Sequence, residues 1–282
     1  MPQLMVKAAS SSARAYVGIS GYNYPRWRGS FYPQGLPARR WLEYASREFN
    51  SIELNGTFYS LKSPAVFRRW FDETPPHFTF AVKGSRFITH NLKLTRAQTP
   101  LANFFASGIL ALGRKTGPFL WQLPEMVRFN RERMVDFFKL LPAGSTAAAR
   151  LARRHDARLK RGALAKPAAR VRYRHAFEVR HDSFFTEGFY ALLRRFGYAL
   201  VIADTAGKFP CVEEITADFV YVRLHGSTAL YASDYSDAEL ADWARRVRQW
   251  RDRGLDVYVY FDNDALAHAP NNARSLAQLV NV

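Results

Sequence analysis

Short apolar runs alternate with longer amphipathic stretches along almost the whole chain of 282 residues. Eight runs of five to seven residues are rich in Val, Ile, Leu, Phe and Tyr, which is typical of buried strands. Parallel strands need crossover connections that are usually helical, so this alternation indicates a parallel α/β architecture. The runs occupy residues 16–20, 51–55, 78–83, 118–123, 174–180, 199–203, 219–224 and 257–261.

The stretches between these runs carry helical periodicity and helix start signals. Ser63 and Pro64 fit an N-cap followed by proline at the first helical position, and Asn130 fits the N-cap of a later helix. The link from Asp204 to Phe219 is too short for a full helix. The predicted helices cover residues 37–49, 64–73, 96–112, 131–141, 186–196, 237–253 and 270–279.

Eight such units in about 270 residues suit a closed (β/α)8 TIM-type barrel better than an open doubly wound sheet. An open sheet more often carries a glycine-rich nucleotide loop, and the sequence has none. We expect a single barrel domain over residues 15–282, preceded by a flexible N-terminal extension over residues 1–14. A basic insertion at residues 145–170, between strands four and five, is expected to be partly helical or a solvated charged hairpin.

Polar side chains stand near the carboxyl end of every predicted strand. In the run 174–180, Glu178 and Arg180 share one face while Phe177 and Val179 share the other. In a barrel these polar ends meet at the rim where active sites lie, which favours a ligand site over a purely structural network of ion pairs. The set comprises Ser20, Glu53, Asn55, Lys83, Gln122, Glu178, Arg180, Asp204, Arg223, His225 and Asp262.

Several short motifs follow one another in a fixed order from about Tyr16 to the C-terminus. They are GISG at 18–21 with Trp27, NGTFY at 55–59, Lys83 with Arg86, Thr89 and His90, QLP at 122–124, FEVRH at 177–181, Ala203 with Asp204, YVRLHG at 221–226, and YFDN at 260–263. In this order they resemble the YecE-like family, a domain of unknown function (DUF72). The resemblance implies a TIM-type barrel with these motifs around one pocket, and no established reaction.

The rim suggests acid and base chemistry on a small anionic, phosphorylated or sugar-containing substrate. Adjacent cations should keep Glu178 ionised, as a general base or an anchor, and His225 is the predicted proton donor. Asp204 is the third catalytic candidate, because paired carboxylates could serve a glycosidase. His181 could exchange a proton or anchor its loop.

The predicted substrate-binding residues fall into three chemical groups. Cations that would clamp a phosphate or carboxylate come first, and flat aromatic faces that would stack on a sugar or base come second. Polar groups of the rim complete the set. The residues are Lys83, Arg180 and Arg223; Tyr22, Trp27, Tyr59 and Tyr231; and Glu53, Asn55, Gln122, His90, His181, Asp262 and Asn263.

The formal charge of +17 is concentrated in one segment. Residues 147–174 hold ten basic side chains and one acid, Asp156, so a nucleic-acid partner or a nuclease activity is the main alternative function. A non-catalytic ligand sensor is the third. The oligomeric state stays open.

No cofactor is predicted. A Mg²⁺ or Mn²⁺ ion held by Glu53, Glu178, Asp204, His225 and Asp262 is an open alternative, without local ligand spacing to support it. The single Cys211 excludes an internal disulfide. The sequence has no apolar run near the roughly 20 residues that span a bilayer and no secretory signal, so we expect a cytoplasmic protein without a membrane partner.

Overall fold

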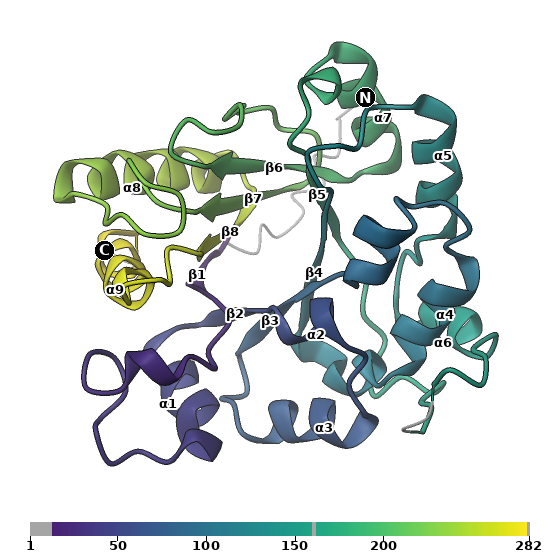
Figure 1. Cartoon of the computed structure of the whole chain (residues 1–282), viewed down its shortest axis with the longest axis horizontal. Helices are drawn as coiled ribbons and strands as arrows, with labels where there is room; N and C mark the ends of the chain where they lie inside the picture. Colours follow the sequence, from purple (N-terminus) through teal and green to yellow (C-terminus); the bar gives the residue numbers. More distant parts are fainter. Residues whose placement is uncertain (1–12, 160–161, 281–282) are drawn as a thin grey trace, which may run out of the picture.

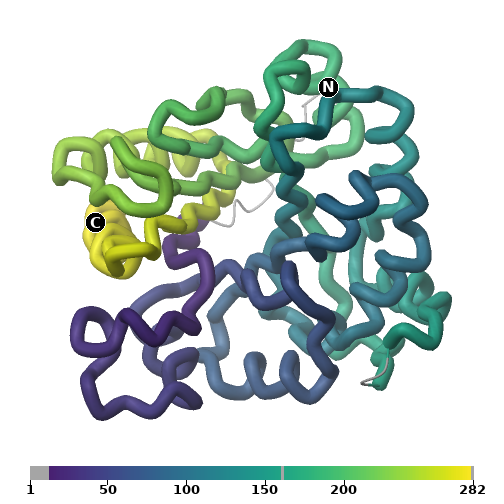
Figure 2. The backbone as a smooth tube through the Cα atoms, viewed as in Figure 1, coloured from purple at the N-terminus to yellow at the C-terminus, as the bar shows by residue number. Residues whose placement is uncertain are grey.

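The computed structural model describes residues 13–159 and 162–280, and its strands close into a barrel in sequence order. Every strand pairs in parallel with its neighbours, and β1 closes the ring against β8. Figure 1 shows the ring of strands with the helices outside it, and the tube in Figure 2 follows the same circuit. The predicted TIM-type barrel is therefore confirmed. The strands are β1 Ala15–Ser20, β2 Ser51–Leu54, β3 Thr79–Lys83, β4 Thr116–Gln122, β5 His175–Glu178, β6 Ala199–Asp204, β7 Phe219–Leu224 and β8 Asp256–Phe261.

The helices begin close to where the sequence signals place them. Asn130 caps its helix, since its side-chain oxygen accepts a hydrogen bond from Arg133 N at 2.8 Å, whereas Ser63 makes no side-chain cap bond. The described link between β6 and β7 contains no helix. The helices are α1 Trp41–Glu48, α2 Gly56–Tyr59, α3 Pro64–Asp72, α4 Gln98–Ala106, α5 Arg131–Leu140, α6 Ser145–Ala152, α7 Glu187–Phe196, α8 Asp237–Asp252 and α9 His268–Val280.

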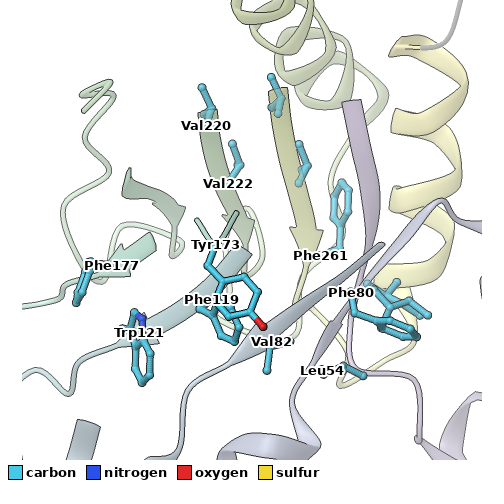
Figure 3. Close-up of a cluster of buried hydrophobic side chains, with 14 of the residues drawn as sticks. Leu54, Phe80, Val82, Phe119, Trp121, Tyr173, Phe177, Val220, Val222 and Phe261 are labelled. Atoms are coloured by element: carbon cyan, nitrogen blue, oxygen red, sulfur yellow. The ribbon is translucent and has the colours of Figure 1, made fainter. Parts of the chain in front are cut away.

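Alternation along each strand separates two apolar regions. Ala176 and Tyr221 belong to the cluster inside the lumen, whereas Phe177 and Val222 belong to the larger core between strands and helices. Figure 3 shows this outer core, with Phe119, Phe177 and Val222 among its labelled side chains. The polar residues that alternate with Phe177 and Val222 must therefore point into the lumen.

The basic insertion begins as part of the helical layer and is not a detached hairpin. Within α6, Ala148, Ala149 and Ala152 are buried, and the helix packs against α4. The described residues after Arg153 and up to Arg170 contain no further helix or strand. The arginines of the insertion are not part of the contact between α6 and α4, which the buried alanines make.

Most of the predicted N-terminal extension, residues 1–12, lies outside the described residues. Arg14 already follows the barrel, because its backbone N–H donates to Asp256 Oδ1 at 3.0 Å and its carbonyl accepts from Val257 N at 2.8 Å. These bonds tie Arg14 to the start of β8, and β1 begins at the next residue, Ala15.

Candidate functional site

Arg223 on β7 lies at the centre of the charged cluster at the top of the lumen. It is fully buried, and its Nε and Nη2 donate to the two oxygens of Glu53 at 3.1 Å and 2.9 Å. Its Nη1 donates to Glu178 Oε2 at 2.7 Å. Its Nη2 also lies 2.8 Å from Asp262 Oδ2 and 3.0 Å from Ser20 Oγ. All three guanidinium nitrogens are engaged with protein groups, so in this structure Arg223 organises the carboxylates, and its role as an anion clamp stays a prediction.

These contacts fix the ionisation of the carboxylates. Burial alone would raise the pKa values of Glu178 and Asp262, but the charge of Arg223, with further cations nearby, holds both pKa values well below their usual range. Both groups are therefore carboxylates at neutral pH. Carboxylates this strongly stabilised are anchors and poor proton donors, consistent with the expectation that Glu178 is ionised.

Glu53 is the deepest of the three carboxylates. It is fully buried, and besides Arg223 it accepts hydrogen bonds from Ser20 Oγ and, at 2.6 Å, from the hydroxyl of Tyr221. Both of its oxygens are occupied. Because its oxygens are held by Arg223, Ser20 and Tyr221, Glu53 acts in this structure as an anchor for Arg223, and its contact with substrate stays a prediction.

His225, the predicted proton donor, is enclosed within the same cluster. Its Nδ1 lies 3.1 Å from Asp262 Oδ2 and has no aligned hydrogen-bond partner among the described residues. Its Nε2 lies 3.3 Å from Arg223 Nη1 and 3.7 Å from Glu178 Oε1. The side chain is fully buried, so His225 presents no surface to a substrate in this conformation.

Lys83 differs from the other charged groups of the lumen because its ammonium is not paired. It ends β3 and is 8% exposed, and its Nζ lies 4.8 Å from the centre of the Phe58 ring. Among the described residues, no hydrogen bond or ion pair joins Nζ to another side chain. Burial, followed by the charge of Arg223, lowers the pKa of Lys83, while the three carboxylates oppose this shift.

His90 lies beside Lys83, in the π-helical turn Phe87–Asn91 that follows β3. Its ring packs edge-on against Phe58, with centroids 5.1 Å apart. Burial, followed by the charges of three cations, lowers the pKa of His90 to about 4, and the cations are Lys83, Arg86 and Arg180. The imidazole is therefore neutral at pH 7, chiefly because burial disfavours its charged form, and the neighbouring cations add to this effect.

Arg180 and Tyr231 form the opposite side of the opening. The Nη2 of Arg180 donates to Glu178 Oε1 and to the Tyr231 hydroxyl, both at 3.1 Å, and its guanidinium lies 5.0 Å above the Phe209 ring. Gln122, which is nearly buried, stands opposite Glu178 in the β4–β5 register. We call the accessible part of the cluster the barrel mouth, comprising Lys83, His90, Arg180, Tyr231 and Asp262.

A pocket of about 250 Å³ adjoins this region and contains two of the predicted aromatic residues. Tyr22 and the exposed Tyr59 line it together with Lys62 and Asn55. The Nδ2 of Asn55 donates to Ser20 Oγ at 2.9 Å, while its buried Oδ1 has no hydrogen-bond partner among the described residues. The pocket therefore offers aromatic faces and one unused acceptor.

Asp204 lies on the wrong face for the predicted catalytic role. The neighbouring Ala203 belongs to the lumen cluster, so the side chain of Asp204 points outward. Its Oδ2 accepts from the Tyr235 hydroxyl at 3.0 Å, and it lines a different pocket of about 460 Å³ against α8. In this geometry Asp204 and Glu178 lie on different faces of the strands, so their pairing across a substrate stays a prediction that the side-chain directions do not favour.

Two other predicted contacts are structural. Trp27 is fully buried, packs 4.5 Å from Tyr24, and donates from Nε1 to the Asp264 carbonyl at 3.2 Å, so its ring has no free face. Asn263 is also buried, and its Nδ2 donates to Ser233 O and Asn272 Oδ1, each at 2.9 Å.

His181 takes the anchoring role that the sequence analysis left open beside proton exchange. Its Nδ1 accepts from Ser183 N at 3.1 Å and caps the short 3-10 helix Asp182–Phe184.

Sequence reasoning missed two residues of the site. Tyr24 donates from its hydroxyl to Ser20 O at 2.8 Å and lines the pocket with Tyr22. Its position in an aromatic turn directly after β1 was an available signal. Phe209, beneath Arg180, lies in an irregular link whose sequence carries no such signal.

The described residues contain no group of three or more His, Cys, Asp or Glu side chains placed to hold a metal ion. Three of the predicted ligands instead use their oxygens on Arg223. Within the same residues, no helix has the length and apolar character needed to cross a membrane.

Comparison with known proteins gives a consistent family relationship. The family model described as "Protein of unknown function DUF72" matches residues 16–282. The UPF0759 protein YunF of Bacillus subtilis (strain 168) is 22% identical over 291 residues, covering 95% of both chains. The UPF0759 protein YecE of Escherichia coli (strain K12) is 30% identical over 109 residues, which cover 39% of this chain and 37% of YecE.

Solved structures agree. A DUF72 family protein from Thermotoga maritima MSB8 is 26% identical and superimposes with a TM-score of 0.75. The match covers 95% of this chain and 100% of the Thermotoga chain. A DUF72 family protein from Enterococcus faecalis V583, 16% identical, shares the fold with a TM-score of 0.69 over 95% of this chain and 96% of its own.

Proposed function

Because the chain belongs to the DUF72 family, whose function is unknown, we propose a function from its own residues. The proposal is an enzyme that binds a small substrate carrying a phosphate or carboxylate at the barrel mouth and transfers a proton on that substrate. Lys83 and Arg180 bind the anionic group, and His90 accepts the proton. Glu178, Asp262 and His225 position these groups.

The unpaired ammonium of Lys83 is the observation that carries the proposal. A buried cation without a partner is costly, and a bound anion would remove that cost. The three cations that lower the pKa of His90 indicate that the potential favours an anion at this location. Arg180 offers a second cationic edge, although it also holds Glu178.

Proton transfer fits His90 better than His225. His90 is partly exposed and neutral at pH 7, whereas His225 is fully buried. An anion bound beside His90 would raise the pKa of His90 from about 4 toward neutrality, where imidazole is an effective general base. Binding of the substrate would thus prepare the base that acts on it.

The adjoining pocket supports a substrate with hydroxyl groups. Tyr22 and Tyr59 line it and offer faces to a sugar-like ring. A small phosphorylated hydroxy-carbonyl compound combines these features, because its anionic group suits Lys83 and its acidic C–H suits a weak base.

The test begins with inorganic phosphate and continues with a panel of small sugar phosphates in D2O. We expect phosphate to stabilise the wild type against heat and Lys83→Met to lose this effect. We expect at least one panel member to exchange a C–H for deuterium, as followed by NMR. His90→Asn should abolish exchange, while the matched exposed-site variant His77→Asn should retain it.

Two results would refute the proposal. Phosphate stabilisation that survives in Lys83→Met would remove the anion site from Lys83. Saturable binding of panel members without exchange or turnover would identify a ligand sensor and refute the enzyme.

A further inference from the structure

The insertion after α6 is fastened along the outside of α4 and the 3-10 helix Ile109–Lys115. Leu164 N donates to Ala106 O at 2.8 Å, and Ala168 N donates to Leu110 O at 3.0 Å. Near its other end, Val171 N donates to Ser145 Oγ at 3.0 Å. These bonds hold the described part of the insertion in one conformation against the barrel.

The only acid of the insertion is used to fasten it. Asp156 Oδ1 accepts from Asn103 Nδ2 at 2.9 Å, and its backbone N–H donates to Asn103 Oδ1 at 3.0 Å. Hydrogen bonding by Asn103, followed by that of the Arg158 backbone, lowers the pKa of Asp156. The carboxylate of Asp156 therefore binds Asn103 of α4, and the one cation that it pairs with among the described residues is Arg158, whose Nε lies 3.6 Å from Asp156 Oδ2.

Five further cations in the described part of the insertion are exposed and have no acidic partner among the described residues. Arg150 lies in α6, Arg153 and Arg154 follow directly after the helix ends at Ala152, and all three are exposed. Lys166 and Arg170 are exposed further along. No ion pair joins these five side chains to any Asp or Glu in the described parts of the chain. We call these five residues the basic strap.

The elements beneath the basic strap do not neutralise it. The sequence has no Asp or Glu between residues 74 and 124, which include α4 and the 3-10 helix. Arg114, in that 3-10 helix, adds a further exposed cation. The nearest acids that precede this stretch, Asp72 and Glu73, lie at the end of α3, where Glu73 pairs with Arg69.

We propose that the basic strap is a binding surface for the phosphate backbone of a nucleic acid, separate from the barrel mouth. Four of its five side chains are arginines, which bind phosphate oxygens in a bidentate manner. The strap shows no exposed large apolar side chain of the kind that inserts into a lipid surface. Binding should be independent of base sequence, because backbone contacts do not read bases.

The test is fluorescence anisotropy of a labelled 20-base-pair DNA duplex at salt concentrations between about 50 and 200 mM. If all five cations neutralise phosphates, log K should fall against log salt with a slope of about −4.5, roughly 0.9 per contact. Over this fourfold range of salt the affinity should fall by about 500-fold.

The variant Arg150→Gln/Arg154→Gln removes two exposed strap cations, one within α6 and one in the turn that follows it. Its slope should become shallower by about 1.8. The control Arg39→Gln/Arg253→Gln removes the same charge from exposed sites elsewhere and should keep the original slope. Point variants are needed because deleting the insertion would also remove the buried alanines of α6. Circular dichroism of each variant would check that it is folded.

Absence of duplex binding at 100 mM salt would overturn the proposal. So would equal loss in the strap variant and the control, since that result would reflect net charge alone. Strap-dependent binding to vesicles of anionic phospholipid without duplex binding would also overturn it and would indicate a membrane surface as the partner.

Discussion

Removing the charge of Lys83 should raise the pKa of His90, which lies at about 4 in the wild type. Lys83 Nζ is 4.8 Å and the His90 ring 5.1 Å from the centre of the same Phe58 ring. The ammonium and the imidazole are therefore within about 10 Å of each other. A positive neighbour disfavours the imidazolium, so Lys83→Met should shift the titration of His90 upward.

Coulomb's law sets the size of the shift. At about 10 Å, two unit charges interact by about 1.7 kcal/mol at an effective dielectric of 20 and by about 0.4 kcal/mol in bulk water. These limits correspond to roughly 0.3 to 1.2 pKa units. Because His90 is partly exposed, we expect a rise of about half a unit.

The assay is an NMR titration of the imidazole nitrogens in protein labelled with ¹⁵N-histidine. Lys139→Met, which removes an exposed charge on α5, is the matched control and should leave the pKa of His90 unchanged. Inorganic phosphate should raise the pKa of His90 in the wild type but not in Lys83→Met. An unchanged or lower pKa in Lys83→Met would refute the electrostatic description of the mouth.

Two further predictions concern stability. Burial, opposed by the Pro142 carbonyl, lowers the pKa of His175 to about 4, below its unfolded value of about 6.5. Between these two pKa values the unfolded state therefore binds more protons than the folded state, so up to about 3 kcal/mol of the free energy of unfolding should be lost as pH falls from about 6.5 to about 4. Urea unfolding should show a smaller loss for His175→Gln than for the wild type. An equal loss in the two proteins would refute His175 as the origin of this pH dependence. Arg223→Met should cost about 3–5 kcal/mol, because it leaves buried carboxylates without their cation. That cost should be smaller at pH 4.5 than at pH 8, since the carboxylates can then take up protons, and a pH-independent cost, or the same cost in exposed Arg39→Met, would contradict it.

Strand alternation explains why much of the site was predictable. Phe177 and Val179 mark the outer face of β5 and its extension, which leaves Glu178 and Arg180 for the lumen, as the structure shows. The same rule places Tyr221, Arg223 and His225 together. The rule requires only that apolar and polar residues alternate along the strand, so that each face can be recognised.

Asp204 shows where that rule fails. Every residue from Ala199 to Ala203 is apolar, because β6 is buried on both faces, so the strand carries no polar mark of its register. A single polar residue at its end can then be assigned to either face. The enclosure of Arg223 could not be predicted from the sequence either, since it depends on side chains from distant strands meeting in space.

The contacts of Arg223 also affect how this protein folds. Its partners come from the first, second and fifth strands and from the residue after the last, and Glu53 and Ser20 lie 170 and 203 residues away in the chain. Contacts of such long sequence separation form slowly, because the intervening chain must first be ordered. During synthesis the cluster can assemble only after Asp262 has left the ribosome. The carboxylates of the earlier strands lack their cation until Arg223 has emerged, and the cluster is complete only when Asp262 follows, so closure of the ring and assembly of the site both come late.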